Sequence, residues 1–117
     1  MSPERWERLL REVVQIGGVR GAAVVNADDG LVVHEAVMDE VSAQDVAALA
    51  SAVVLRSTAM FRALGEPVTR MVTMSASGGT LIAVQGQHDL WLVAVTDPAA
   101  ELGRLRLLLG DLVPELA

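Results

Sequence analysis

The sequence predicts an α+β fold with the element order αββαβββα. Apolar residues recur at helical spacing in three segments, and five short runs between these segments are rich in β-branched residues. The chain has 117 residues, which is the usual size of a domain with a single core. Of these residues 52% are hydrophobic and only 3% are aromatic, so Ala, Val and Leu must fill the interior.

The first helix is expected to begin at Ser2. Ser2 can cap the helix, the ring of Pro3 sets a helical φ angle, and the charge of Glu4 favours the positive end of the helix dipole. Gly17 and Gly18 are expected to end it. Its apolar positions recur at helical spacing: Trp6, Leu9, Leu10, Val13 and Val14.

Residues 19–37 are expected to form a β-hairpin. Two β-rich runs flank the segment "ADDG" at 27–30. Within it, Asp29 and Gly30 can adopt the positive φ angles that a tight hairpin turn requires.

A long second helix is expected from Ser42 to Leu64. Ser42 followed by Asp45 is similar to a capping box, neither Gly nor Pro interrupts the helical pattern, and Gly65 follows its end. One apolar side of this helix is expected to face a sheet. This predicted core stripe consists of Val46, Leu49, Ala50, Val53, Met60, Phe61 and Leu64.

Three β-rich runs follow and are expected to form a meander: "VTRMVTMSA" at 68–76, "TLIAVQG" at 80–86 and "LWLVAV" at 90–95. Asp97 and Pro98 are expected to cap a last helix, with Arg104 on its solvent side. The apolar stripe of this last helix consists of Leu102, Leu105, Leu109, Leu112 and Val113.

The segment "SGG" at 77–79 is expected to turn the chain. A phosphate-binding glycine loop leads from a strand into a helix, whose N-terminus faces the anion. Here the segment joins two expected strands, so Gly78 and Gly79 are expected to supply turn conformations. The sequence therefore predicts no nucleotide cofactor.

No enzyme signature emerges from the remaining polar residues. His34 and His88 are far apart in the sequence and lack the spacing of a metal site. Ser75 and Ser77 are not surrounded by the glycines of a nucleophile elbow. We therefore expect neither a catalytic residue nor a metal.

Charge and cysteine content exclude several classes of partner. The net charge of −6 and the absence of a basic run argue against nucleic acid and against an anionic membrane surface. The chain has no Cys, which fits an intracellular location. The apolar run "VAALASAVVL" at 46–55 ends at Arg56, well short of a membrane span. A cytoplasmic location is expected.

The side of the second helix opposite its predicted core stripe is small and uncharged, where a solvated side would carry Lys and Glu. It contains Ala48, Ala52, Leu55 and Ala59. Ala has a high helix propensity, so an exposed Ala-rich side alone requires no partner. The apolar side chain of Leu55 instead favours a contact with another protein, and a second copy of the chain is the simplest such partner. We expect a homodimer.

The strand at 68–76 contains no Pro or Lys that would protect an open sheet edge. The same strand in a second copy of the chain could pair with it. The predicted dimer interface therefore adds Val68, Arg70, Val72 and Met74 to the helical residues.

The αββαβββα order, the hairpin "VVNADDGLVV", the helix after "VSAQDVAALASAVV" and the glycine turn before "TLIAVQ" together resemble the roadblock/dynein light chain family. The similarity covers nearly the whole chain and implies a single domain over residues 1–117. It implies a five-stranded antiparallel sheet with the long second helix on one face and the terminal helices on the other. It also implies dimers in which second helices pack together and third strands pair.

The resemblance also implies a function. Prokaryotic members of this family commonly act with Ras-like small GTPases, so the chain is expected to be a non-catalytic homodimeric regulator or scaffold of such a GTPase. Residues beside the helix-pair surface are expected to contact it: Ser51, Arg56, Thr58 and Arg62. The alternative is a small-molecule sensor module with a pocket between helix and sheet layers.

Overall fold

The computed structural model describes residues 3–38, 40–65, 70–86 and 89–112. Its elements follow the order αββαβββα, as predicted. They are α1 (Pro3–Val14), β1 (Val19–Asn26), β2 (Leu31–Ala36), α2 (Ala43–Ala63), β3 (Met71–Ala76), β4 (Gly79–Gln85), β5 (Leu90–Thr96) and α3 (Leu102–Leu112).

The five strands form one antiparallel sheet in the order β2-β1-β5-β4-β3. The central pair, β1 and β5, joins the hairpin of the first half to the meander of the second half. Strands β2 and β3 are the two edges. This confirms the five-stranded antiparallel sheet that the resemblance implied.

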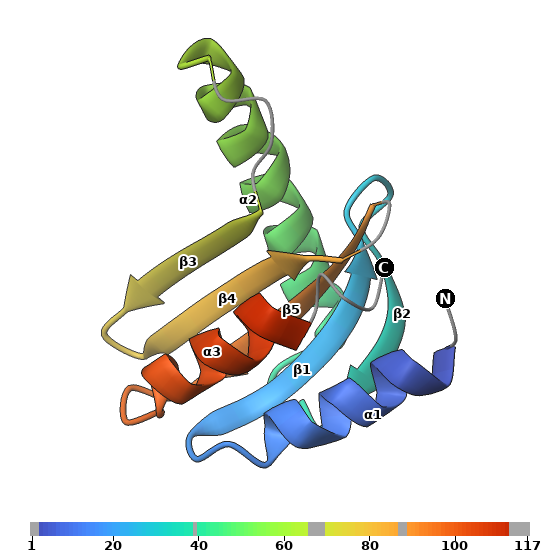
Figure 1. Ribbon diagram of the computed structural model, residues 1–117, viewed down its shortest axis with the longest axis vertical. Helices are drawn as coiled ribbons and strands as arrows, with labels where there is room; N and C mark the ends of the chain where they lie inside the picture. The colour runs from blue at the N-terminus through green and yellow to red at the C-terminus, as the bar shows by residue number, and fades with distance from the viewer. Residues whose placement is uncertain (1–2, 39, 66–69, 87–88, 113–117) are drawn as a thin grey trace.

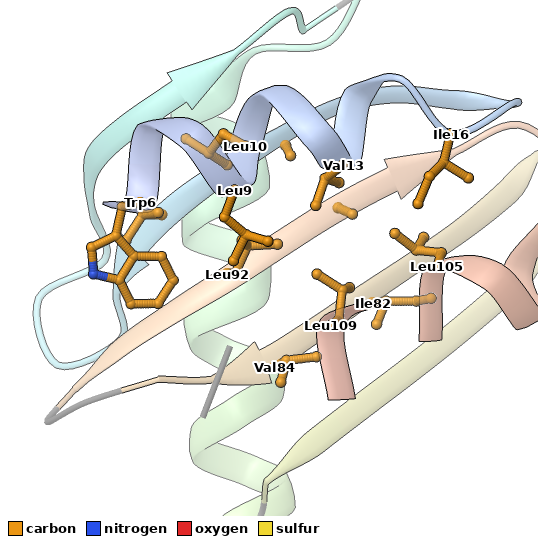
Figure 2. Packing of buried hydrophobic residues seen from close by; sticks show 13 residues of the cluster. Trp6, Leu9, Leu10, Val13, Ile16, Ile82, Val84, Leu92, Leu105 and Leu109 are labelled. Carbon is orange, nitrogen blue, oxygen red and sulfur yellow. The ribbon is translucent and has the colours of Figure 1, made fainter. Parts of the chain in front are cut away.

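Helices cover both faces of the sheet (Figure 1). Helices α1 and α3 pack on one face, where the strand side chains of Val24, Ile82 and Leu92 meet them in a buried core. Figure 2 shows this core, with Leu10 and Val13 of α1 and Leu105 and Leu109 of α3 directed towards the strands. Among the described helices, α2 is the one on the other face, where it packs over Val25, Ala83 and Val93. The predicted layering is confirmed.

Helix α2 begins and ends close to the predicted residues. The Ser42 side chain accepts a hydrogen bond from the Asp45 backbone N–H at 3.4 Å, which caps the N-terminus. At the other end the backbone N–H of Leu64 donates to the carbonyl of Met60, and Gly65 adopts a φ of +88°.

The predicted core stripe of α2 needs correction. Its buried residues are Ala43, Val46, Ala47, Ala50, Ser51 and Val54. Leu49, Met60, Phe61 and Leu64, which the helical wheel placed in the core, are exposed, and Val53 is half-buried. The C-terminal half of α2 projects past the β3 edge of the sheet, so none of the described strands lies beneath that half (Figure 1). A helical wheel predicts on which side of the helix each side chain lies, but it does not predict how far the sheet extends beneath the helix.

The last helix begins later than predicted. Asp97 does not cap α3, because its side chain accepts a hydrogen bond from the Ala99 N–H at 2.9 Å within a separate turn, and α3 starts at Leu102. Leu105 and Leu109 are buried and Leu102 is half-buried, as expected of the apolar stripe. Val113, the last member of that stripe, lies outside the described residues.

Helix α2 is long and apolar enough to cross a membrane by length and composition alone. It has 21 residues, and its most apolar window has a mean hydropathy of 1.4 even though that window contains Arg56. The core helix of a folded domain meets the same criterion, and α2 buries its N-terminal half against the sheet.

Candidate functional site

The free edge of β3 is the first candidate site. The Gln85 N–H donates to the Arg70 carbonyl at 2.9 Å, so the backbone of Arg70 points towards β4. Inward and outward backbone groups alternate along an antiparallel strand, which turns the N–H and C=O groups of Met71, Thr73 and Ser75 outward. These three residues offer their backbone to another strand.

The two edges of the sheet differ in how well they could accept a strand. Edge strand β2 has an irregular register opposite Val24 and Val25, and it carries His34 and Glu35. Bulges and charges of this kind protect edges from pairing. Strand β3 pairs with β4 in an unbroken register over six residues and contains no charged side chain. The β3 edge is therefore the one suited to pairing.

The predicted strand residues lie along this edge. Val72 and Met74 pair with Ala83 and Leu81, which belong to the core beneath α2, so both side chains lie on the α2 face of the sheet. Val72 is half-buried and Met74 is exposed. Arg70 is exposed at the start of the strand, and the predicted interface residue Val68 lies outside the described residues.

Helix α2 carries two exposed apolar stripes. The first, which we call the outer stripe, is the predicted set: Ala48, Leu55 and Ala59 are exposed and Ala52 is half-buried. The second stripe lies on the side of α2 that faces β3, and we call it the β3-side stripe. It consists of Leu49, Val53 and Met60, which share one helix side because they are four and seven residues apart. The exposed Arg56 lies on the same side, seven residues after Leu49 and four before Met60.

The surroundings of α2 place the two stripes on different sides. Leu49 lines a groove together with Met74 of β3. Ser51 lies towards the opposite edge, where its hydroxyl donates to the carbonyl of Ala27 in the β1–β2 turn at 2.5 Å. Leu55 follows Ser51 by four residues and shares its side of the helix. Leu55 therefore lies on the side of α2 that faces the β1–β2 turn. That the outer stripe and the β3 edge form one interface stays a prediction.

The predicted partner-binding residues differ in their exposure. Arg56 and Arg62 are exposed and Thr58 is half-buried. Ser51 is only 7% exposed and its hydroxyl is bonded to the Ala27 carbonyl, so we remove it from the candidate surface as a correction. A Ser in an Ala-rich helix gives no sign in sequence of whether it is buried.

A groove of about 310 Å³ opens between the N-terminal half of α2 and the end of the β3–β4 hairpin. Most of its lining atoms are apolar, and it includes Val46 and Leu49 of α2, Met74 and Ala76 of β3, and Leu81 of β4. The sequence did not reveal it, because its walls come from distant segments.

The polar side chains considered for catalysis or metal binding do not gather at one place among the described residues. Within the described parts of the chain, no group of three or more His, Asp or Glu side chains is placed to hold a metal ion. The half-buried His34 has its Nδ1 3.8 Å from Oε1 of the exposed Glu7, and His88 lies outside the described residues. The Ser75 hydroxyl shares a hydrogen bond with that of Thr80 at 2.9 Å across the β3–β4 pair.

These features define a class of protein: an α+β domain whose prominent surfaces are an open strand edge and an apolar helix, both suited to protein contacts. A family model described as the Roadblock/LC7 domain matches residues 6–96. The chain belongs to the Roadblock/LC7 family, which confirms the resemblance.

Solved structures share the fold. A Roadblock/LC7 domain from Streptomyces avermitilis superposes with a TM-score of 0.82 at 22% identity, covering 93% of this chain and 92% of that one. The gliding protein MglB from Thermus thermophilus gives 0.82 at 21% identity, covering 97% and 89%. MglB from Myxococcus xanthus gives 0.85 at 15% identity, covering 99% and 94%. A comparison with curated protein sequences finds no match.

Proposed function

We propose that this chain is a cytoplasmic, non-catalytic regulator or scaffold that forms a homodimer and binds a Ras-like small GTPase. One observation carries the proposal: α2 exposes two apolar stripes on different sides, next to a free strand edge. One stripe can serve self-association while the other stays available to a different protein.

The dimer contact is assigned to the β3 side. Two β3 edges related by a two-fold axis pair in antiparallel fashion, and the outward backbone groups of Met71, Thr73 and Ser75 then find partners. Such pairing brings Val72 and Met74 of both copies under the β3-side stripes. A continuous sheet across two copies would remove the unprotected edge.

The GTPase contact is assigned to the outer stripe. Ala48, Ala52, Leu55 and Ala59 form an apolar strip that the β3 contact leaves open. The exposed guanidinium group of Arg62, which follows Leu55 by seven residues and so shares the side of the outer stripe, suits acidic side chains or phosphate. Arg56 follows Leu49 by seven residues and lies on the β3 side instead. The choice of a Ras-like GTPase comes from the family resemblance, and the similar structures include a gliding protein.

The experiment measures binding of the purified chain to each Ras-like GTPase encoded in the same genome, loaded in turn with GDP and with a non-hydrolysable GTP analogue. Titration calorimetry is expected to give a complex with one GTPase and a clear preference for one nucleotide state. The hydrolysis and exchange rates of that GTPase then show whether the effect is regulation or scaffolding. Failure to bind any of these GTPases in either state would contradict the proposal.

A further inference from the structure

The helical layer formed by α1 and α3 leaves one strand of the sheet uncovered. Helix α1 packs over β1 and β2. Helix α3 packs over β4 and β5 through Leu105 and Leu109. Figure 1 shows both helices in front of the sheet and β3 beyond α3, with neither helix in front of it. Each of these helices covers two strands, and none of the described helices covers this face of β3.

Three side chains of β3 lie on the uncovered face. Thr73 pairs with Ile82, which belongs to the core beneath α3, so both side chains lie on the α3 face of the sheet. Alternation along the strand places Met71 and Ser75 on the same face. All three are exposed, Met71 by 37%. We call Met71, Thr73 and Ser75 the β3 shelf.

The side of α3 next to the β3 shelf carries a glycine and an arginine. A Cβ built at Gly110 would lie 3.8 Å from Cε of Met71, which places Gly110 on the β3 side of the helix. Arg106 is exposed, precedes Gly110 by four residues and shares its side. Leu107, three residues before Gly110, is 68% exposed. A neighbouring segment can therefore approach α3 closely at Gly110, beside an apolar side chain and a positive charge.

The charge of Arg106 contrasts with that of the molecule as a whole, which is −6. Among the ion pairs between described residues, none includes Arg106. Arg104, two residues away and hence on nearly the opposite side of α3, has its Nη1 3.5 Å from Oε2 of Glu101. The three residues of the β3 shelf carry no charge. A carboxylate brought beside Arg106 can therefore form a charge-assisted, bidentate contact with its guanidinium group.

The space over β3 suits one α-helix. Neighbouring strands lie about 4.8 Å apart, so two strand spacings amount to about 10 Å, close to the diameter of a helix with its side chains. A third helix placed beside α3 would continue the layer over β3 and its free edge. Edge pairing of β3, as in the proposed dimer, uses backbone groups and leaves this face of the strand open.

We propose that the β3 shelf and the adjoining side of α3 form a docking site for one acidic amphipathic helix of a partner protein. Its apolar side chains pack on Met71 and Leu107, and a carboxylate beside them binds Arg106. The site lies on the face of the sheet opposite α2, so it is separate from the proposed GTPase contact. The chain could then hold two different proteins at once.

The test uses a displayed library of peptides, each long enough for several helical turns, that tile the proteins encoded in the same genome. Peptides that bind the purified chain are measured again with the variants Arg106→Glu and Arg104→Glu, the second being a matched control on the other side of α3. An acidic amphipathic peptide is expected whose affinity falls by about 10-fold with Arg106→Glu and by less than about 2-fold with Arg104→Glu. A library without any peptide that shows this difference would overturn the proposal.

The second arm exchanges the charges of the selected peptide and the chain. A peptide with Lys in place of its carboxylates is expected to bind the Arg106→Glu variant more tightly than the parent chain. Gly110→Gln fills the place where the helix approaches α3 and should weaken the original peptide by about 10-fold, while the chain stays folded because Gln favours helices. Circular dichroism checks the fold of each variant. Charge exchange that restores no binding, or full binding to a folded Gly110→Gln variant, would contradict a helix docked at this site.

Discussion

Two adjacent glycines in the β3–β4 turn are not equivalent at the scale of single residues. Gly79 has a φ of +145°, and a Cβ built there would overlap the carbonyl oxygen of Thr96. No atom of the described residues lies within 4 Å of a Cβ built at Gly78. The sequence predicted that both turn the chain, but only the packing of β4 against β5 shows which one admits no side chain.

Alanine substitution should separate the two glycines. Gly79→Ala is expected to lower the free energy of unfolding by about 3 kcal/mol or more, because strained backbone and overlap with a neighbouring strand add together. Gly78→Ala should change it by less than about 1 kcal/mol. Urea unfolding followed by circular dichroism measures both. Equal effects would mean that the turn is not built as described.

Ser51 supplies a second prediction at this scale. Its hydroxyl is the donor to the Ala27 carbonyl across 24 residues of sequence, and both groups are buried. Ser51→Ala removes the donor, leaves the carbonyl unsatisfied and should cost about 1–3 kcal/mol of stability. If Ser51 instead contacts a partner, the variant should keep its thermal midpoint and lose binding, which a melting curve and a binding titration would distinguish.

At the scale of elements, local signals predicted most of the fold. Caps and glycines around α1 and α2 and the β-rich runs placed those elements within a few residues. Local signals failed at Asp97, because the same residue types cap helices and close turns. The Asp97 side chain closes a turn with Ala99, and α3 begins only at Leu102. They failed again for the core stripe of α2, since periodicity carries no information on where a sheet ends.

The pairing role of β3 can be tested by proline at neighbouring positions. Thr73 turns its N–H outward, so Thr73→Pro should leave the β3–β4 ladder intact and shift the mass towards the monomer. Val72→Pro removes an inward N–H and should instead lower stability by about 3 kcal/mol. Light scattering and thermal unfolding are run on both variants. A Thr73→Pro variant that remains fully dimeric would contradict pairing through this edge.

At the scale of the whole molecule, the site depends on sheet order, which no local pattern encodes. The sequence alone showed that the outer stripe is apolar and that the β3 strand lacks the residues that protect a sheet edge from pairing. Whether they form one surface depends on the position of α2 over the sheet, and the contact from Ser51 to the β1–β2 turn places Leu55, four residues further along α2, on the side of that turn. The β3-side stripe went unrecognised because Leu49 and Met60 were assigned to the core.

Arginine substitutions on the two sides of α2 test whether one side makes the dimer contact and the other binds the GTPase. Leu55 and Met60 are similarly exposed, at 57% and 67%, and lie on different sides of one helix. Met60→Arg buries like charges near the two-fold axis and is expected to weaken the dimer by several kcal/mol, that is, by about 100-fold or more. Leu55→Arg should keep the dimer mass and the circular dichroism of the parent but abolish GTPase binding, because it disrupts the outer stripe alone. The sequence-based expectation was the reverse for Leu55, namely loss of the dimer. A folded, monomeric Leu55→Arg variant beside a dimeric Met60→Arg variant would therefore restore the outer stripe as the two-fold contact and move the GTPase site to the β3 side.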